Sequence, residues 1–192
     1  METGIMDEKL LKQKTTKQLL WIGVISIVML FAAFTSAYVV RRDSNDWQHF
    51  ELPEMFYIST AFILLSSASM NWAQSAIKKN NLNNTKTALL LTLFLGIAFA
   101  FSQYLAWGQL HKNNIFFMGK SSHAAGSFLY FITLMHVLHV LGGLIALLIT
   151  FFKASLKKYS ATDYLGIQLC SIYWHFLDVL WIYLFVFLFF MR

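Results

Sequence analysis

Long apolar stretches separated by short polar segments dominate the chain. They cover about residues 19–40, 55–77, 88–110, 126–152 and 164–191. A helix needs roughly 20 apolar residues to cross a bilayer, and each stretch reaches that length. Spanning strands would be about half as long and would alternate in polarity, which these stretches do not. The pattern predicts an all-α, polytopic membrane protein in which residues 19–192 form one bundle of five transmembrane helices.

The distribution of Lys and Arg predicts the orientation of this bundle. Residues 1–18 form a polar tail with four lysines, which we expect at the membrane surface. Segments 78–87 and 153–163 fall on the same side and add three lysines each. That side therefore carries ten of the 15 Lys and Arg residues, and the opposite side carries five. Because basic residues accumulate on the inner side, we expect a cytoplasmic N-terminus and a periplasmic C-terminus.

Composition narrows the class of protein further. Hydrophobic residues make up 58% of the chain and charged residues only 12%, about half of the roughly 25% usual in soluble domains. These values exclude a disordered chain, a disulfide-stapled secreted module and an ordinary soluble enzyme. The net charge of +6 reflects loop lysines that set orientation, so we do not expect a nucleic-acid partner. Cys170 is the single cysteine, and we expect it to be a small buried side chain.

A few polar side chains lie within the apolar stretches, where each one costs free energy. The most informative are Gln103, His136, His139, His175 and Asp178. His136 and His139 are three residues apart and so share one helical face, and His175 and Asp178 have the same spacing. The helical rise places His139 and His175 at similar depth, near the middle of the bilayer. The sequence is therefore compatible with a side-chain hydrogen bond between the fourth and fifth helices.

Three roles are open for these side chains. His136, His139 and His175 could be haem ligands, which would make the chain a b-type membrane cytochrome. With Asp178 they could instead hold a metal ion, because imidazole and carboxylate groups suit zinc or iron. In the third role, the polar groups satisfy one another and determine how two helices pack. This structural role is favoured, because three deep histidines at one level do not make matched haem pairs and no second intramembrane carboxylate is available.

Two segments are far more specific than generic transmembrane sequence. Residues 173–181 read Tyr-Trp-His-Phe-Leu-Asp-Val-Leu-Trp, and residues 136–142 read His-Val-Leu-His-Val-Leu-Gly. The first resembles the last-helix signature of subunit III of the haem–copper terminal oxidases, the cytochrome c oxidase subunit III family. The second resembles the H-x-x-H-V-x-G segment of the preceding helix in that family, and Pro53 ahead of a Ser-rich helix is a weaker match. The motif residues are Gln103, His136, His139, Gly142, Trp174, His175 and Asp178.

The resemblance implies a fold and a role. Five helices are similar to the short, bacterial type of the family, located in the inner membrane. Such a subunit has no catalytic or metal-binding residue, and haem and copper are expected in its partner subunits I and II. It is expected to stabilise subunit I, to support proton uptake and to bind phospholipid, with a small subunit IV and a respiratory supercomplex as further candidate partners. The electron donor of the complex, cytochrome c or quinol, stays open.

Two positions depart from the family pattern. The family commonly has an acidic residue after a Ser in the first of these five helices, but Ile27 follows Ser26 here. Many members also have a Glu three residues after the Gln in the third helix, and that position is Ala106. Roles that rest on those carboxylates therefore do not transfer to this chain, and Asp178 is the one acidic residue left deep within a stretch.

Overall fold

The computed structural model describes residues 2–42, 52–118, 124–161 and 163–191, with side chains described from residue 11 onward. Five helices account for most of them. They are α1 (Glu2–Arg42), α2 (Met55–Lys78), α3 (Leu82–Lys112), α4 (Ala124–Ser155) and α5 (Leu165–Met191). The prediction of an all-α protein built from five helices is therefore confirmed.

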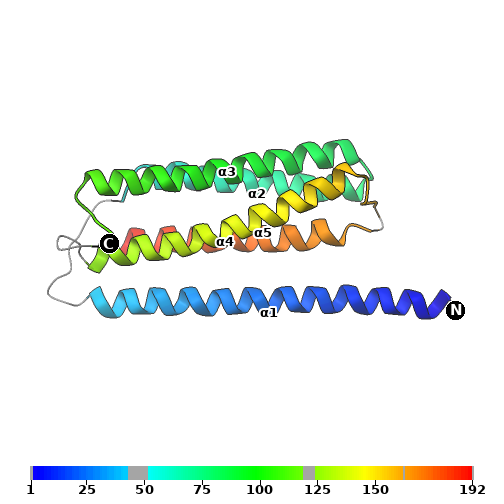
Figure 1. Cartoon of the computed structure of the whole chain (residues 1–192), viewed down its shortest axis with the longest axis horizontal. Coiled ribbons are helices and arrows are strands. Elements are labelled where there is room, and N and C mark those ends of the chain that lie inside the picture. The colour runs from blue at the N-terminus through cyan, green and yellow to red at the C-terminus, as the bar shows by residue number, and fades with distance from the viewer. Residues whose placement is uncertain (1, 43–51, 119–123, 162, 192) are drawn as a thin grey trace.

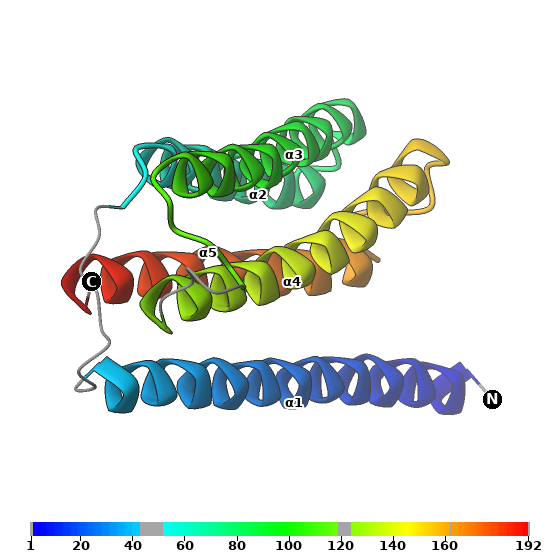
Figure 2. The same ribbon diagram turned by 60° about the vertical axis from the view of Figure 1, so that its left-hand side comes forward.

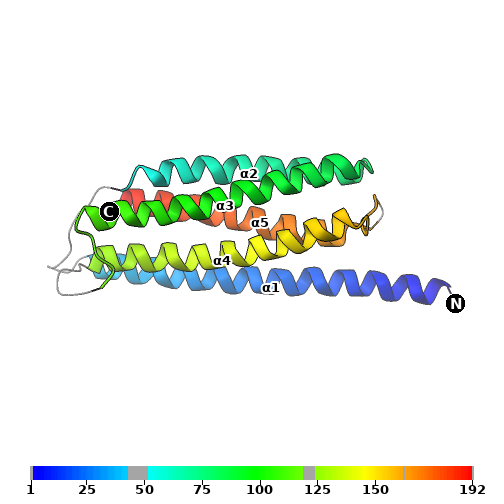
Figure 3. The ribbon, with the colours of Figure 1, turned by 45° about the horizontal axis from the view of Figure 1, so that its top comes forward.

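The helices lie roughly along one direction in three layers (Figures 1 and 2). The antiparallel pair α2 and α3 forms one layer, α4 and α5 form the middle layer, and α1 lies on the far side of the middle layer from α2 and α3. The two ends of the chain lie at opposite ends of the bundle, and α1 extends beyond the other helices at its N-terminal end (Figure 3). Consecutive helices run in opposite directions, as the sequence pattern predicts.

Four described helices are long and apolar enough to cross a membrane: α1 from Leu11 onward, α3, α4 and α5. They correspond to the first, third, fourth and fifth predicted spans. Helix α2 has the position and length of the second span but is not one of these four. Its apolar residues are interrupted by hydroxyl and amide side chains, among them Ser66, Ser67, Ser69 and Asn71.

Helix α1 is much longer than the apolar stretch within it. It begins at Glu2, so that residues 2–18, which the sequence marks as a polar tail, continue the helix of the first span. The segment 11–18 contains Leu, Lys and Gln, which are good helix formers, and no Gly or Pro to interrupt it. The hydroxyls of Thr15 and Thr16 also donate hydrogen bonds back to carbonyls one turn earlier.

Local signals explain where α3 begins and where the turns lie. The side chain of Asn81 accepts a hydrogen bond from the amide of Asn84 and caps the helix, which starts six residues before the apolar stretch. Asn80 and Asn114 adopt positive φ angles of 55° and 60° just after α2 and α3. Asparagine tolerates this left-handed conformation better than most residues, so both positions suit a helix end.

Large aromatic side chains fill the centre of the bundle. Trp181 of α5 packs edge-to-face against Phe56 of α2 and Phe99 of α3, with ring centroids 5.7 and 5.1 Å apart. Phe31 brings α1 into the same core, and Cys170 is a free, buried thiol, as predicted. The core therefore joins all five helices.

Candidate functional site

A seam of small hydroxyl side chains on α2 holds this helix to its neighbours. Five of them are hydrogen-bonded to α3 or α5: Ser59, Thr60, Ser66, Ser67 and Ser69. We call these residues the α2 hydroxyl seam. The hydroxyls that interrupt the apolar stretch of α2 therefore point toward protein.

Tryptophans of α5 bind two residues of the seam. Trp174 Nε1 donates to Ser66 Oγ at 2.8 Å, and Trp181 Nε1 donates to Thr60 Oγ1 at 3.0 Å. Both indole rings are buried, so an unbonded N–H would cost free energy. These bonds set the register of the antiparallel helices α2 and α5.

The opposite side of the seam binds α3. Gln103 Nε2 donates to Ser59 Oγ at 2.8 Å, and both side chains are fully buried. Ser69 Oγ donates to the carbonyl of Ala88 at 2.9 Å and accepts from Thr92 Oγ1 at 3.1 Å. Gln103, a family-motif position, is thus an interhelical residue in this fold.

His175 and Asp178 form a polar cluster with Ser67. Nδ1 of His175 lies 2.9 Å from Ser67 Oγ and 3.5 Å from Asp178 Oδ2. Only 3% of Asp178 is exposed, while the His175 side chain is 29% exposed. Ser67 is the hydrogen-bond partner of Nδ1, whereas neither oxygen of Asp178 has one among the described residues. A carboxyl at this distance suits either an ion pair with a protonated imidazole or a neutral acid. The pairing runs along α5 and across to α2.

His136 lies inside a box of aromatic rings and is fully buried. The ring centroids of Trp181, Phe99 and Phe31 lie 5.2, 5.8 and 6.3 Å from its own. Neither ring nitrogen has a hydrogen-bond partner among the described residues. The rings on three sides occupy the space that a porphyrin on this histidine would need, so the site does not fit haem.

The three deep histidines have separate surroundings. Nδ1 of His139 donates to the carbonyl of Met135 at 2.7 Å, and its ring packs on Phe31, whereas His175 faces α2. Within the described parts of the chain, no three His, Cys, Asp or Glu side chains are placed to hold one metal ion. The donor geometry therefore does not fit the alternative of a shared metal site.

Glycines allow close approach around Trp174. A Cβ on Gly96 of α3 would lie 2.6 Å from the Trp174 ring, and one on Gly143 of α4 would lie 3.3 Å from it. A Cβ on Gly142, the motif glycine, would meet only Tyr173 Oη at 4.0 Å. Gly96 and Gly143 are thus the glycines that allow close packing around Trp174. For Gly96, the sequence signal was a single glycine within an apolar helix, since small residues favour close helix packing in membranes.

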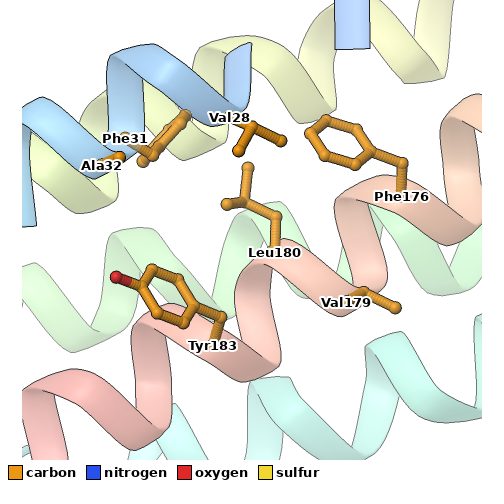
Figure 4. Close-up of a pocket in the computed structure, with 7 residues that line it drawn as sticks. All are labelled: Val28, Phe31, Ala32, Phe176, Val179, Leu180 and Tyr183. Atoms are coloured by element: carbon orange, nitrogen blue, oxygen red, sulfur yellow. The ribbon is translucent and has the colours of Figure 1, made fainter. Parts of the chain in front are cut away.

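An apolar groove of about 350 Å³ lies between α1 and α5 (Figure 4). It is lined by Val28, Phe31 and Ala32 of α1 and by Phe176, Val179, Leu180 and Tyr183 of α5. The Tyr183 hydroxyl lies 3.1 Å from Thr35 Oγ1. With its almost wholly hydrocarbon lining, the groove suits an apolar chain and offers few partners to a polar ligand.

The connections from α2 to α3 and from α4 to α5 lie at the same end of the bundle (Figure 1). Lys86 Nζ of α3 donates to the carbonyl of Ser155 in the last turn of α4, at 3.3 Å. This bond satisfies a carbonyl that a helix C-terminus leaves free. Lysines 78, 79, 153, 157 and 158 lie in or beside the same connections, so this end of the bundle is basic.

Comparison with known proteins identifies the family. Residues 9–192 match the family model of cytochrome c oxidase subunit III. A probable cytochrome c oxidase subunit 3 of Rickettsia conorii is 34% identical over 145 residues, which are 74% of this chain and 48% of that protein. The cytochrome bo(3) ubiquinol oxidase subunit 3 of Buchnera aphidicola is 31% identical over 175 residues, 88% of this chain and 90% of that protein.

The lengths of these relatives differ. The chain spans about half the length of most of the curated relatives it matches, including a subunit 3 of Rhipicephalus sanguineus at 51%. It spans nearly the whole of the Buchnera protein. The family match covers all five helices except the first residues of α1. The chain belongs to the cytochrome c oxidase subunit III family.

Proposed function

We propose that this chain is a non-catalytic subunit III of a proton-pumping haem–copper terminal oxidase, an enzyme that reduces oxygen in aerobic respiration. The observation that carries the proposal is that the motif residues bind other residues of this same helix bundle. Gln103, Trp174 and His175 each bind a hydroxyl of α2, and Asp178 lies beside His175. Such side chains hold helices together, which is what a supporting subunit requires of them.

The role of the chain in the complex is to stabilise subunit I and to sustain proton uptake. Haem and copper belong to subunits I and II in this proposal, and this chain binds none. A small subunit IV and a larger supercomplex are further partners. The broad apolar outer faces of α1 and α3, with exposed side chains such as Met29 and Phe94, support contact with other membrane subunits or with lipid.

Phospholipid is the ligand that we propose for this chain. An acyl chain would lie in the groove between α1 and α5, because the residues that line that groove are apolar (Figure 4). Anionic lipid head groups would bind at the lysine-rich end of the bundle. Ala32→Phe, which narrows the groove, should reduce the lipid retained in native mass spectrometry. Ala33→Phe is the matched control, because Ala33 is exposed and does not line the groove.

The proposed location is a bacterial inner membrane, with all five helices crossing it. Helix α2 would cross as well, because its seam hydroxyls are bonded to α3 and α5 and do not face lipid. A polar group that is hydrogen-bonded inside a bundle costs much less than one in hydrocarbon. The excess of lysines on one side supports a cytoplasmic N-terminus and a periplasmic C-terminus.

Deletion of the chain tests the proposal. The oxidase purified without it should contain its normal haem and should reduce oxygen at first, with cytochrome c and quinol assayed separately as donors. Activity should then decay during turnover, and adding back the wild-type chain should prevent the decay. An assembled complex with normal haem but no initial oxygen reduction would contradict a supporting role. Stoichiometric haem in the purified chain would instead establish the cytochrome alternative.

A further inference from the structure

Two buried polar side chains on adjacent helices have atoms without a hydrogen-bond partner among the described residues. His136 of α4 and Gln103 of α3 are both fully buried. Gln103 Nε2 donates to Ser59, but its Oε1 has no hydrogen-bond partner among the described residues, and neither has Nδ1 or Nε2 of His136. Buried polar atoms of native proteins nearly always have a partner, so these atoms point to one that is not protein.

The register of α3 and α4 places the two side chains at the same level. Trp107 Nε1 donates to Thr133 Oγ1 at 3.0 Å. One turn back along α3 from Trp107 is Gln103, and one turn forward along α4 from Thr133 is His136. Further along the same antiparallel interface, a Cβ on Gly96 would lie 2.8 Å from Leu144. Contacts on both sides therefore place Gln103 and His136 at the same level of this interface.

A partner shared by the imidazole N–H of His136 and by Gln103 Oε1 must accept from the first and donate to the second. A neutral imidazole has one N–H donor and one acceptor nitrogen, whereas the amide oxygen of Gln103 only accepts. We propose that a single water molecule is bound between Gln103 Oε1 and a ring nitrogen of His136. The water accepts the imidazole N–H and donates to the amide oxygen. Internal waters occupy such sites when at least two polar groups converge on them.

The surroundings favour water over other ligands. Phe31, Phe99 and Trp181 enclose His136, so that a large molecule does not fit, and none of these three rings carries a charge that would balance an ion. With water in place, one polar chain runs from Ser59 through Gln103 and the water to His136. It links α2, α3 and α4 in the middle of the bundle and explains why both polar residues are kept in an apolar core.

A structure of the intact oxidase complex, at a resolution that shows ordered water, tests the site directly. We expect a density peak about 2.7–3.2 Å from both Gln103 Oε1 and one nitrogen of His136. A direct bond between the two side chains would overturn the proposal. So would an imidazole N–H directed at the face of Phe99 with no peak beside it, because a weak N–H–π contact would then be the partner.

A double-mutant cycle on the whole complex gives an independent readout. Gln103→Leu and His136→Leu should each lower the temperature at which this chain dissociates, since each leaves polar atoms of the other residue buried and unpaired. The dissociation temperature of the double variant should fall by clearly less than the sum of the two single decreases, because neither residue is then left with an unpaired polar atom. Simple additivity would contradict a shared water.

A matched control uses another buried polar residue of α3. Thr92 lies three turns from Gln103 and bonds Ser69 of α2. The losses from Thr92→Val and His136→Leu should add, because the two residues share no partner. Coupling of equal size in this control pair would show that the cycle reports general loosening of α3, and would remove the support for the water.

Discussion

The indole Nε1 of Trp174 donates a hydrogen bond of 2.8 Å to the hydroxyl of Ser66, and the ring of the same residue fills the space beside Gly96 and Gly143. One side chain of α5 therefore joins three helices at once. Its polar edge sets the register of α2, and its apolar face leaves no room for a Cβ at Gly96 of α3 and little room for one at Gly143 of α4. This dual use explains how a helix as rich in hydroxyls as α2 is held in an apolar bundle.

Trp174→Phe should weaken the bundle because it keeps most of the ring and removes the N–H. Interhelical hydrogen bonds in membrane proteins contribute about 0.6–1.7 kcal/mol, and loss of packing area adds to this value. The chain should therefore dissociate from the purified complex at a lower temperature. Trp72→Phe is the control, because Trp72 is 44% exposed on α2. Equal effects of the two variants would refute the role of the Ser66 bond.

Gly96→Ala should destabilise the protein by about 1–3 kcal/mol, the usual range for overpacking a core. The added Cβ would lie 2.6 Å from the rigid Trp174 ring, so the ring or the helix has to move. Gly108→Ala on the same helix has nothing within 4 Å of its Cβ and should be neutral or slightly stabilising. Thermal unfolding of the detergent-solubilised complex compares the two, and a stable Gly96→Ala variant would show that the interface is looser than the structure indicates.

Asp178→Asn should assemble and support near-normal oxidase activity, since the amide keeps the shape and the hydrogen-bonding capacity beside His175. Asp178→Leu removes the polar group that lies 3.5 Å from His175 Nδ1 and leaves that nitrogen with Ser67 alone, which should cost about 1–3 kcal/mol. Less of this chain should then remain bound to the complex. Subunit stoichiometry and proton pumping are measured on both variants. A fully assembled Asn variant that no longer pumps would identify the carboxylate as a proton carrier.

The proposed orientation is checked with a reporter that is active only in the cytoplasm. Fused after Arg192 it should be silent, and fused ahead of residue 1 it should be active, because the lysine-rich side is expected inside. Activity of the C-terminal fusion would show either that the orientation is the reverse or that fewer than five helices cross the membrane. A third fusion at Asn81, between α2 and α3, should be active if α2 crosses the membrane.

The length and spacing of the apolar stretches were enough to predict the five helices and their antiparallel order. The histidine and aspartate motifs were enough to indicate the family. Both signals are local: a helix that crosses a membrane must be long and apolar, and a motif can be read without knowing its neighbours. The polar segment ahead of residue 19 did not show where the first helix begins, since its composition suits both a polar tail and the N-terminal part of α1.

What the polar residues contact was decided by tertiary structure. Helical spacing put His136 and His139 on one face, but only packing placed His136 among aromatic rings and His175 beside Ser67 on α2. Gly142 and Gly143 are adjacent in sequence, yet only Gly143 meets Trp174 closely. One residue step turns a side chain by about 100° around a helix. Periodicity therefore shows which residues share a face, whereas only the assembled bundle determines which neighbour that face meets.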